Sequence, residues 1–302
     1  MEVALKIDVD THQGLGEGVP RLQALLERRG VVGSFFIAMG PDNSGRAVMR
    51  MFRNPGFLAK MRRTRAVSMY GLRTILSGTL LPARQIARAF PEVIRGLIGA
   101  GFEVGVHGYD HVRWQDRLDA IGAAGVSAEI AHAFDLFAAI ADARASCFAA
   151  PGWRTNGAAL AALDTRQLRY RSDTRGRFPY RCALGGRLLA TPEIPTTWPT
   201  LDEILGTSAL NAAGSVPRFY LAQLREDALN VHTIHAETEG MAQLDEFSAL
   251  IDALKARSAS FVRLGDVAAR LNVGQLPIHE VIRVTLPGRA GWISAQAPQP
   301  VI

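Results

Sequence analysis

Short apolar runs alternate with helix-like segments about seven or eight times along the chain. This alternation favours a parallel sheet, because each parallel connection needs a crossover segment, usually a helix. The length of 302 residues fits one α/β barrel better than two small domains, and 48% hydrophobic residues supply a sizeable core. The expected strands are residues 3–9, 31–38, 102–106, 145–150, 169–173, 188–191, 229–234 and 259–263. The expected helices are residues 20–30, 87–101, 116–143, 157–168, 220–228 and 241–257.

Two carboxylates lie at the end of the first expected strand. Asp8 and Asp10 fall on the same side of an extended chain, because side chains alternate with a period of two. Buried carboxylates need a partner or a metal, so the pair indicates a site. The alternative is that both are loop acids that cap the next element.

His107 and His111 follow the strand at residues 102–106. At this spacing two imidazoles share one face of a helical turn and can bind one divalent ion. The alternative is a pair of solvated or capping histidines. Further polar residues, including Arg154, Asp173 and His235, also follow strands, and the carboxyl ends of barrel strands are where active sites are built.

Together these residues contain the parts needed for amide hydrolysis. Asp10, His107 and His111 form a set of two histidines and one carboxylate that leaves positions open for water and substrate. Zinc, manganese and cobalt all suit such a site. Asp8 could accept a proton from water, and His235 could protonate a leaving amine.

The segment with the most unusual composition, residues 43–91, is strongly basic. Residues 43–91 contain no Asp or Glu, and the whole chain carries a formal net charge of +6. A basic amphipathic helix followed by apolar residues is typical of an interfacial membrane anchor, although an ordinary solvated helix is the alternative. Nucleic acid is not expected, since no binding motif is present. The basic residues are Arg46, Arg50, Arg53, Lys60, Arg62, Arg63, Arg65, Arg73, Arg84 and Arg88.

These features predict one catalytic domain over residues 1–271, with a membrane-facing insertion at residues 44–91 and a partly loose tail at residues 272–302. The two cysteines, Cys147 and Cys182, form no CxxC pair, which favours reduced thiols. With no leader and no run of 18 apolar residues, we expect a cytoplasmic protein.

Several stretches resemble one known family. They are "KIDVDTHQGLGEGVP", "FFIAMGPDNSGRA", "SMYGLRTILSGT", "EVGVHGYDHVRWQD", "APGWRTN", "YRSDTRG", "EIPTTWPTLDEILG" and "HTIHAETEG". Over about residues 5–271 the chain is similar to the polysaccharide deacetylase (NodB-homology, carbohydrate esterase 4) superfamily. Asp-Val-Asp departs from the family's commonest form, which has adjacent aspartates.

The resemblance implies a distorted (β/α) barrel with about seven strands. Within the superfamily the closer match implies removal of a formyl group from an amino sugar carried on undecaprenyl phosphate. The setting would be lipid A modification and polymyxin resistance, at the cytoplasmic face of the inner membrane.

The resemblance also implies a role for each matching residue. Asp8 becomes the general base and His235 the general acid, while Arg154 orients Asp8 and Asp173 supports His235. The metal ligands are Asp10, His107 and His111. A backbone N–H just after Pro151, in the turn with Gly152 and Trp153, would hold the oxyanion.

Two rival functions stay open at this stage. One is a deacetylase of the same superfamily that acts on an N-acetyl sugar. The other is a catalytically dead protein that binds the membrane surface. Structural or solvent-facing roles are expected for His12 and His232. Glu237 and Glu239 could contact substrate or solvate a loop, and the loop role is the one expected.

Overall fold

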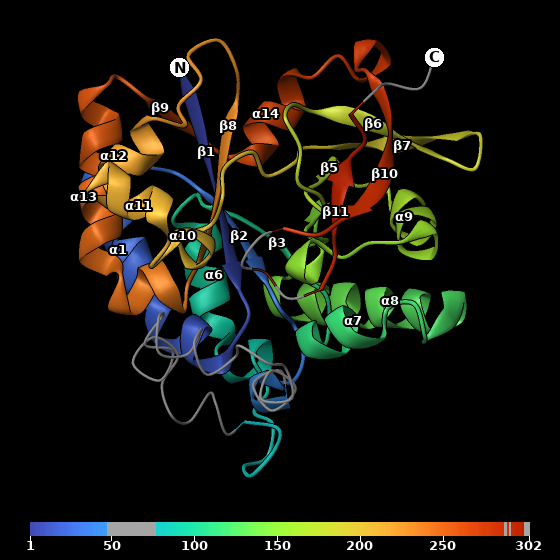
Figure 1. The fold of residues 1–302 in the computed structure, drawn as a ribbon. Coiled ribbons are helices and arrows are strands. Elements are labelled where there is room, and N and C mark those ends of the chain that lie inside the picture. Colours follow the sequence, from blue (N-terminus) through green and yellow to red (C-terminus); the bar gives the residue numbers. More distant parts are fainter. Residues whose placement is uncertain (47–76, 287–288, 290, 299–302) are drawn as a thin grey trace.

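The structure is a computed structural model that describes residues 1–46, 77–286, 289 and 291–298 (Figure 1). The strands are β1 (Glu2–Val9), β2 (Ser34–Ile37), β3 (Glu103–Val106), β4 (Cys147–Phe148), β5 (Tyr170–Arg171), β6 (Tyr180–Leu184), β7 (Arg187–Glu193), β8 (Asn230–His235), β9 (Ser260–Val262), β10 (Ile278–Val284) and β11 (Ile293–Gln296). The helices are α1 (Val19–Arg29), α6 (Pro91–Gly99), α7 (His111–Arg117), α8 (Gly122–Ala141), α9 (Gly157–Asp164), α10 (Leu201–Ile204), α11 (Ser208–Ala213), α12 (Val216–Leu221), α13 (Leu244–Ala256) and α14 (Leu264–Arg270).

The described strands form one sheet in the order β11-β10-β6-β7-β5-β4-β3-β2-β1-β8, and β9 pairs with β1. From β7 through β5, β4, β3, β2 and β1 to β8, every neighbouring pair is parallel. The segment after β7 reaches β8, because the amide of Thr197 donates to the carbonyl of Val231 at 3.1 Å. The two ends of the seven-strand parallel run therefore meet, as the predicted distorted barrel requires.

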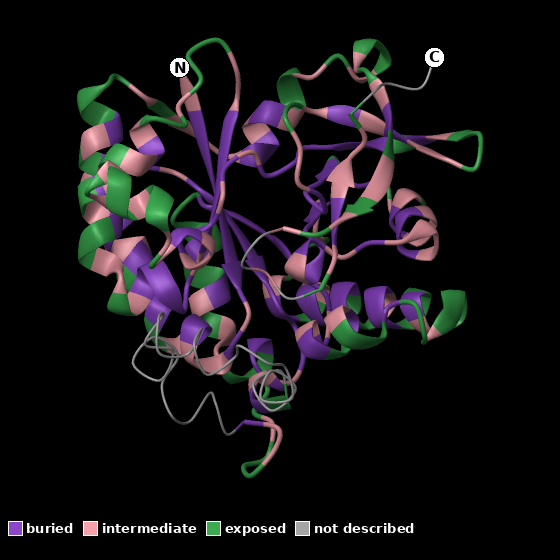
Figure 2. Cartoon of the chain, in the orientation of Figure 1, coloured by how far each residue is buried: buried purple, intermediate pink, exposed green. Residues whose placement is uncertain are grey.

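Strands β1, β2 and β3 at the centre of the sheet are mostly buried (Figure 2). Side-chain alternation divides the core around them into two faces. On β1, Leu5, Ile7 and Val9 belong to the large core cluster that also contains residues of the surrounding helices. Ala4 belongs to a second, smaller cluster with residues of the other parallel strands, such as Phe36. Lys6 and Asp8 share the face of Ala4, so β1 directs them to the inner side of the sheet.

Helix α1 shows how local sequence sets an element's ends. Pro20 lies in the first turn, where its missing N–H costs nothing. Gly30 ends the helix with φ 61°, a conformation that favours glycine. This confirms the helix expected at residues 20–30 and leads the chain directly into β2.

The tail differs from expectation. Residues 272–302 were expected to be partly loose, but β10 pairs in parallel with β6, and β11 pairs antiparallel with β10. The hairpin β6–β7 provides the edge on which β10 adds, and only residues 188–191 of it were predicted as a strand. The division of the chain at residue 271 stays a prediction.

Several other boundaries also differ. Residues 14–18, expected to be a loop, form a π-helical turn, and the helix expected at 220–228 is α12, which begins at Val216 after a Ser215 cap. The helix expected at 116–143 is two helices, α7 and α8. Of the described helices, α8 alone is long and apolar enough to cross a membrane, but its Ile130 and Phe134 belong to the core.

Within the predicted insertion at residues 44–91, residues 47–76 lie outside the described residues. The amphipathic helix predicted there is therefore not tested by the structure. At the described end of this segment, Leu80 is 80% exposed and Leu81 is 44% exposed.

Candidate active site

Three parallel strands deliver the predicted catalytic and metal-binding side chains to one edge. Asp10 follows the last residue of β1, His107 follows β3, and His235 is the last residue of β8. The register of β1 and β8 pairs Asp8 directly with His235. The carboxyl ends of the strands thus bring together residues that lie up to 227 positions apart, as expected for a barrel.

The predicted metal ligands form a compact triad. One ligand atom each from Asp10, His107 and His111 lies within 4.8 Å of the other two. Nε2 of His107 is 3.3 Å from Oδ1 of Asp10, and Nε2 of His111 is 3.4 Å from Oδ2. His111 is not one turn along a helix from His107, as the spacing suggested, because α7 begins only at His111, after the Asp110 cap.

The hydrogen bonding of this triad fits a divalent cation. Nδ1 of His107 donates to the carbonyl of Ala149 at 2.8 Å, so Nε2 is the ring nitrogen that faces Asp10. Oδ1 of Asp10 is buried and has no hydrogen-bond partner among the described residues. A carboxylate oxygen without a partner beside two imidazole nitrogens is a donor set that suits a divalent cation.

The electrostatics of the triad agree with this interpretation. Burial lowers the pKa of His111 to about 4, so its ring is neutral near pH 7, the form that binds metals. Burial alone would raise the pKa of Asp10, but His111 and His107 hold it well below its usual range. The triad therefore supplies one carboxylate and two imidazole nitrogens, of which that of His111 belongs to a neutral ring near pH 7.

Asp8 is held by a lysine. Nζ of Lys6 donates to Oδ1 and Oδ2 of Asp8 at 2.7 and 2.5 Å, and both side chains are buried. The guanidinium of Arg154, predicted to orient Asp8, donates to the carbonyls of Trp292 and Gln115. In the structure Lys6 holds Asp8, and the orienting role of Arg154 stays a prediction.

His235 lies between carboxylates. Burial opposes protonation, but Asp10, Asp202 and Asp8 raise the pKa of His235 above its ordinary value. Its ring meets the Trp153 ring edge-on at 6.4 Å between centroids. The ring therefore favours the protonated form and can act as an acid.

Asp173 was predicted to support His235, and the structure does not bring the two together by a hydrogen bond. Both carboxylate oxygens of Asp173 are buried without a hydrogen-bond partner among the described residues. Burial and the nearby Glu193 raise the pKa of Asp173 well above its usual range, while Arg171 and Lys6 oppose this rise. Asp173 thus belongs to a buried charge cluster below the site.

The turn Pro151–Trp153 forms one wall of the candidate site, where the Trp153 ring meets that of His235. Gly152 has φ 60°, a conformation that favours glycine, and the side chain of Gln115 lies against it. The amides of Trp153 and Arg154 donate to the carbonyls of Ala150 and Pro151. The amide of Gly152 is the remaining donor of the turn.

Comparison with known proteins identifies the family. A Shewanella sediminis protein named as a 4-deoxy-4-formamido-L-arabinose-phosphoundecaprenol deformylase, ArnD, is 35% identical over 296 residues, which cover 98% of this chain and 95% of that protein. A Wigglesworthia glossinidia brevipalpis protein named in the same way is 32% identical, over 92% of this chain and 96% of that one. The chain belongs to this ArnD deformylase family. No protein-family model matches it.

Solved structures show that this chain has the fold of the polysaccharide deacetylases. A Mycobacterium smegmatis protein named as a polysaccharide deacetylase aligns with a TM-score of 0.64 at 20% identity, over 94% of each chain. A Pseudomonas aeruginosa PAO1 protein named in the same way aligns with a TM-score of 0.55 at 15% identity, over 88% of this chain and 90% of that one. The predicted fold class and family are confirmed.

Glu237 and Glu239 hold the backbone of the candidate site. Oε1 of Glu237 accepts hydrogen bonds from the amides of Asp10 and Thr11, both at 2.8 Å, although a loop role was expected. Oε2 of Glu239 accepts from the amide of His235 at 2.8 Å. Two acids just after a strand-borne histidine are the one signal that could have identified them.

Proposed function

We propose that this protein hydrolyses the formamide of undecaprenyl phosphate-linked 4-deoxy-4-formamido-L-arabinose and releases formate. The observation that carries the proposal is the partly buried triad of Asp10, His107 and His111 beside Asp8 and His235, in a chain of the deformylase family. The free amine would serve lipid A modification and polymyxin resistance.

One divalent ion, zinc, manganese or cobalt, would be held by Asp10, His107 and His111. When bound, it would polarise the formyl carbonyl and acidify a water molecule. Both histidines are held in place by groups outside the triad. Nδ1 of His107 donates to the carbonyl of Ala149, and His111 is the first residue of α7. The carboxylate of Asp10 is supported through its own amide by Glu237.

The other residues move protons and hold the carbonyl. Asp8, fixed by Lys6, would accept the proton of the attacking water. The amide of Gly152 would donate to the developing oxyanion, a type of contact worth about 3 kcal/mol. His235, protonated under the influence of the surrounding carboxylates, would give its proton to the leaving amine nitrogen.

The test is formate release from the formamido-arabinose phosphoprenol, or from a short-prenyl analogue, with and without a chelator. We expect chelator-sensitive formate release and no acetate from the N-acetyl analogue. His235→Ala should keep the metal and lose about 10²- to 10⁴-fold in rate, whereas His107→Ala should lose the metal. Acetate without formate would move the protein to the N-acetyl-sugar deacetylases, and neither product would favour a dead binding protein.

We also propose peripheral contact with anionic lipid at the cytoplasmic face of the inner membrane. The support is the acid-free sequence of residues 43–91 together with the exposed Leu80 and Leu81. Cosedimentation with anionic vesicles should weaken in Leu80→Asp, and more so when residues 46–79 are deleted. Phe178→Asp, at another exposed apolar residue, is the control, and unchanged cosedimentation of the deletant would overturn the proposal.

A further inference from the structure

Two arginines lie against the indole ring of Trp153, which forms one wall of the candidate site. The guanidinium carbon of Arg289 is 4.5 Å from the ring centre, and that of Arg175 is 5.2 Å from it. The same indole meets the ring of His235 at 6.4 Å between centroids. Arg289 therefore lies no farther from the His235 ring than these two distances together, which places a guanidinium close to the proposed acid.

The two arginines come from distant parts of the chain that β11 brings together. Arg175 lies between β5 and β6, and Arg289 lies in the tail between β10 and β11. The amide of Arg175 donates to the carbonyl of Ser294 at 3.0 Å, and the amide of Gln296 donates to the carbonyl of Arg175 at 2.8 Å. The tail that was expected to be partly loose thus delivers a cationic side chain to the wall of the site.

These arginines carry a surplus of positive charge. Arg175 and Arg289 both pair with Glu203, at 3.1 and 3.0 Å, and the three side chains are only 14%, 17% and 8% exposed. None of the residues outside the described part of the chain is an Asp or Glu. Asp202, next to Glu203 on α10, raises the pKa of His235, so its charge balances the protonated histidine. Two largely buried cations that share one carboxylate suit a third, anionic group from a ligand.

We infer that Arg175 and Arg289 bind the phosphodiester of a glycosyl phosphate whose sugar lies beside Trp153. The inference rests on the proposed function and adds where the substrate's phosphate is held. The planar donors of a guanidinium match phosphate oxygens. In such a substrate the formamide nitrogen and the phosphate stand at opposite ends of one pyranose ring, and one indole ring likewise separates His235 from Arg289.

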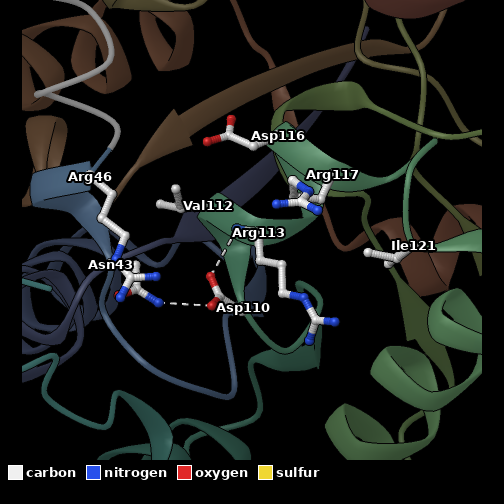
Figure 3. Close-up of a pocket in the computed structure, with 8 residues that line it drawn as sticks. All are labelled: Asn43, Arg46, Asp110, Val112, Arg113, Asp116, Arg117 and Ile121. Carbon is white, nitrogen blue, oxygen red and sulfur yellow. Dashed lines mark hydrogen bonds between the residues drawn. The ribbon is translucent and has the colours of Figure 1, made fainter.

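Another group of arginines offers a comparison within the same molecule. A cavity of about 430 Å³ beside α7 is lined by Arg46, Arg113 and Arg117 (Figure 3). Its described lining residues include none of the metal triad, and neither Trp153 nor His235. An arginine of this cavity can therefore be changed without altering the proposed phosphate subsite.

The test compares two soluble substrates in the full-length metal-loaded protein. One is the formamido-arabinose phosphodiester of a short prenol, and the other is the neutral methyl glycoside of the same formamido sugar. Arg289→Gln should lower kcat/KM for the phosphodiester about tenfold more than for the glycoside, because hydrogen bonds to a charged group are lost. Arg289→Lys, which keeps the charge but not the planar donors, should lose less.

Arg117→Gln is the matched control, since it removes the same charge from the cavity beside α7, and it should change both substrates equally. If Arg289→Gln also lowers both substrates equally, Arg289 acts only through Trp153 and His235, and the phosphate subsite is wrong. A selective loss for the phosphodiester in Arg117→Gln alone would place the phosphate beside α7 and would equally overturn the inference.

Binding of the deformylated product separates this inference from the proposed function. Calorimetry compares the amino-arabinose phosphodiester of a short prenol with the amino-arabinose methyl glycoside, in wild-type and Arg289→Gln protein. A preference for the phosphodiester that is lost in Arg289→Gln supports the subsite, whereas the same preference in both proteins overturns it. No formate from either substrate in the wild type would instead contradict the proposed function.

A last arm separates the two sources of phosphate. The kinetic and binding measurements are made in lipid-free solution and repeated with anionic vesicles. An Arg289→Gln defect that appears only with vesicles would mean that Arg289 binds lipid headgroups and not the substrate's phosphodiester, which overturns the inference. A defect of the same size without vesicles supports it.

Discussion

At the residue scale, Lys6 determines how the proposed base is held. Its ammonium bonds both oxygens of Asp8 and lies 5.2 Å from the Trp153 ring, with no exposure to solvent. Removing one partner of a buried pair leaves the other charge uncompensated, which typically costs about 3 to 5 kcal/mol. Lys6 therefore contributes to both folding and the orientation of Asp8.

We predict that Lys6→Met lowers kcat about tenfold or more, because Asp8 loses its fixed orientation, while the metal content stays that of the wild type. Lys6→Arg, which keeps the charge, should retain more activity. The measurements are kcat, metal content and the midpoint of urea unfolding. Full turnover by folded Lys6→Met would show that Asp8 does not depend on this contact.

At the element scale, β8 packs against α12 through a buried histidine. The ring of His232 lies 4.4 Å from that of Tyr220 and 5.4 Å from that of Trp198, and Nδ1 of His232 has no hydrogen-bond partner in the part of the chain that the structure describes. Burial, together with Arg175 and His235, lowers the pKa of His232 to about 3. The folded protein therefore holds this ring neutral where the unfolded chain would protonate it.

The consequence is a loss of stability in acid. Below the ordinary histidine pKa of about 6.5, His232 binds a proton in the unfolded chain but not in the native state. The free energy of unfolding therefore decreases as the pH is lowered, by up to about 1.4 kcal/mol per pH unit. The loss continues until the pH reaches about 3. His232→Leu should flatten this part of the profile. Parallel wild-type and variant profiles from pH 7 to pH 4, measured by urea unfolding, would contradict the assignment.

The strands differ in how well they could be predicted from the sequence. The parallel strands with motifs at their ends were predictable, because period-two runs such as residues 3–9 carry a local signal. β10 was not, since it pairs with a hairpin more than 90 residues earlier, and β11 pairs in turn with β10. Lys6 was missed for another reason: its partner Asp8 is only two residues away, but a lysine in an apolar strand does not show whether its charged end is buried.

At the scale of the whole molecule, the metal triad joins distant parts of the chain. Asp10 belongs to the end of β1, and His107 and His111 to the connection between β3 and α7, so the ligands come together only in the folded state. An ion that binds the native state and not the unfolded chain stabilises the fold by mass action, by about 2.7 kcal/mol at a hundredfold excess over Kd.

We therefore predict that Zn²⁺ added to the metal-free protein raises the thermal unfolding midpoint. Asp10→Asn and His107→Ala should abolish the rise, because each removes one of the three ligands. Asp8→Asn is the matched control, since it makes the same change two residues away on β1 and removes no ligand. Each variant is compared with its own metal-free form, so any loss of baseline stability from breaking the Lys6 pair does not enter. An equal rise in Asp10→Asn would mean that the stabilising ion binds elsewhere on the molecule, and formate release by that variant would then remove the triad from the mechanism.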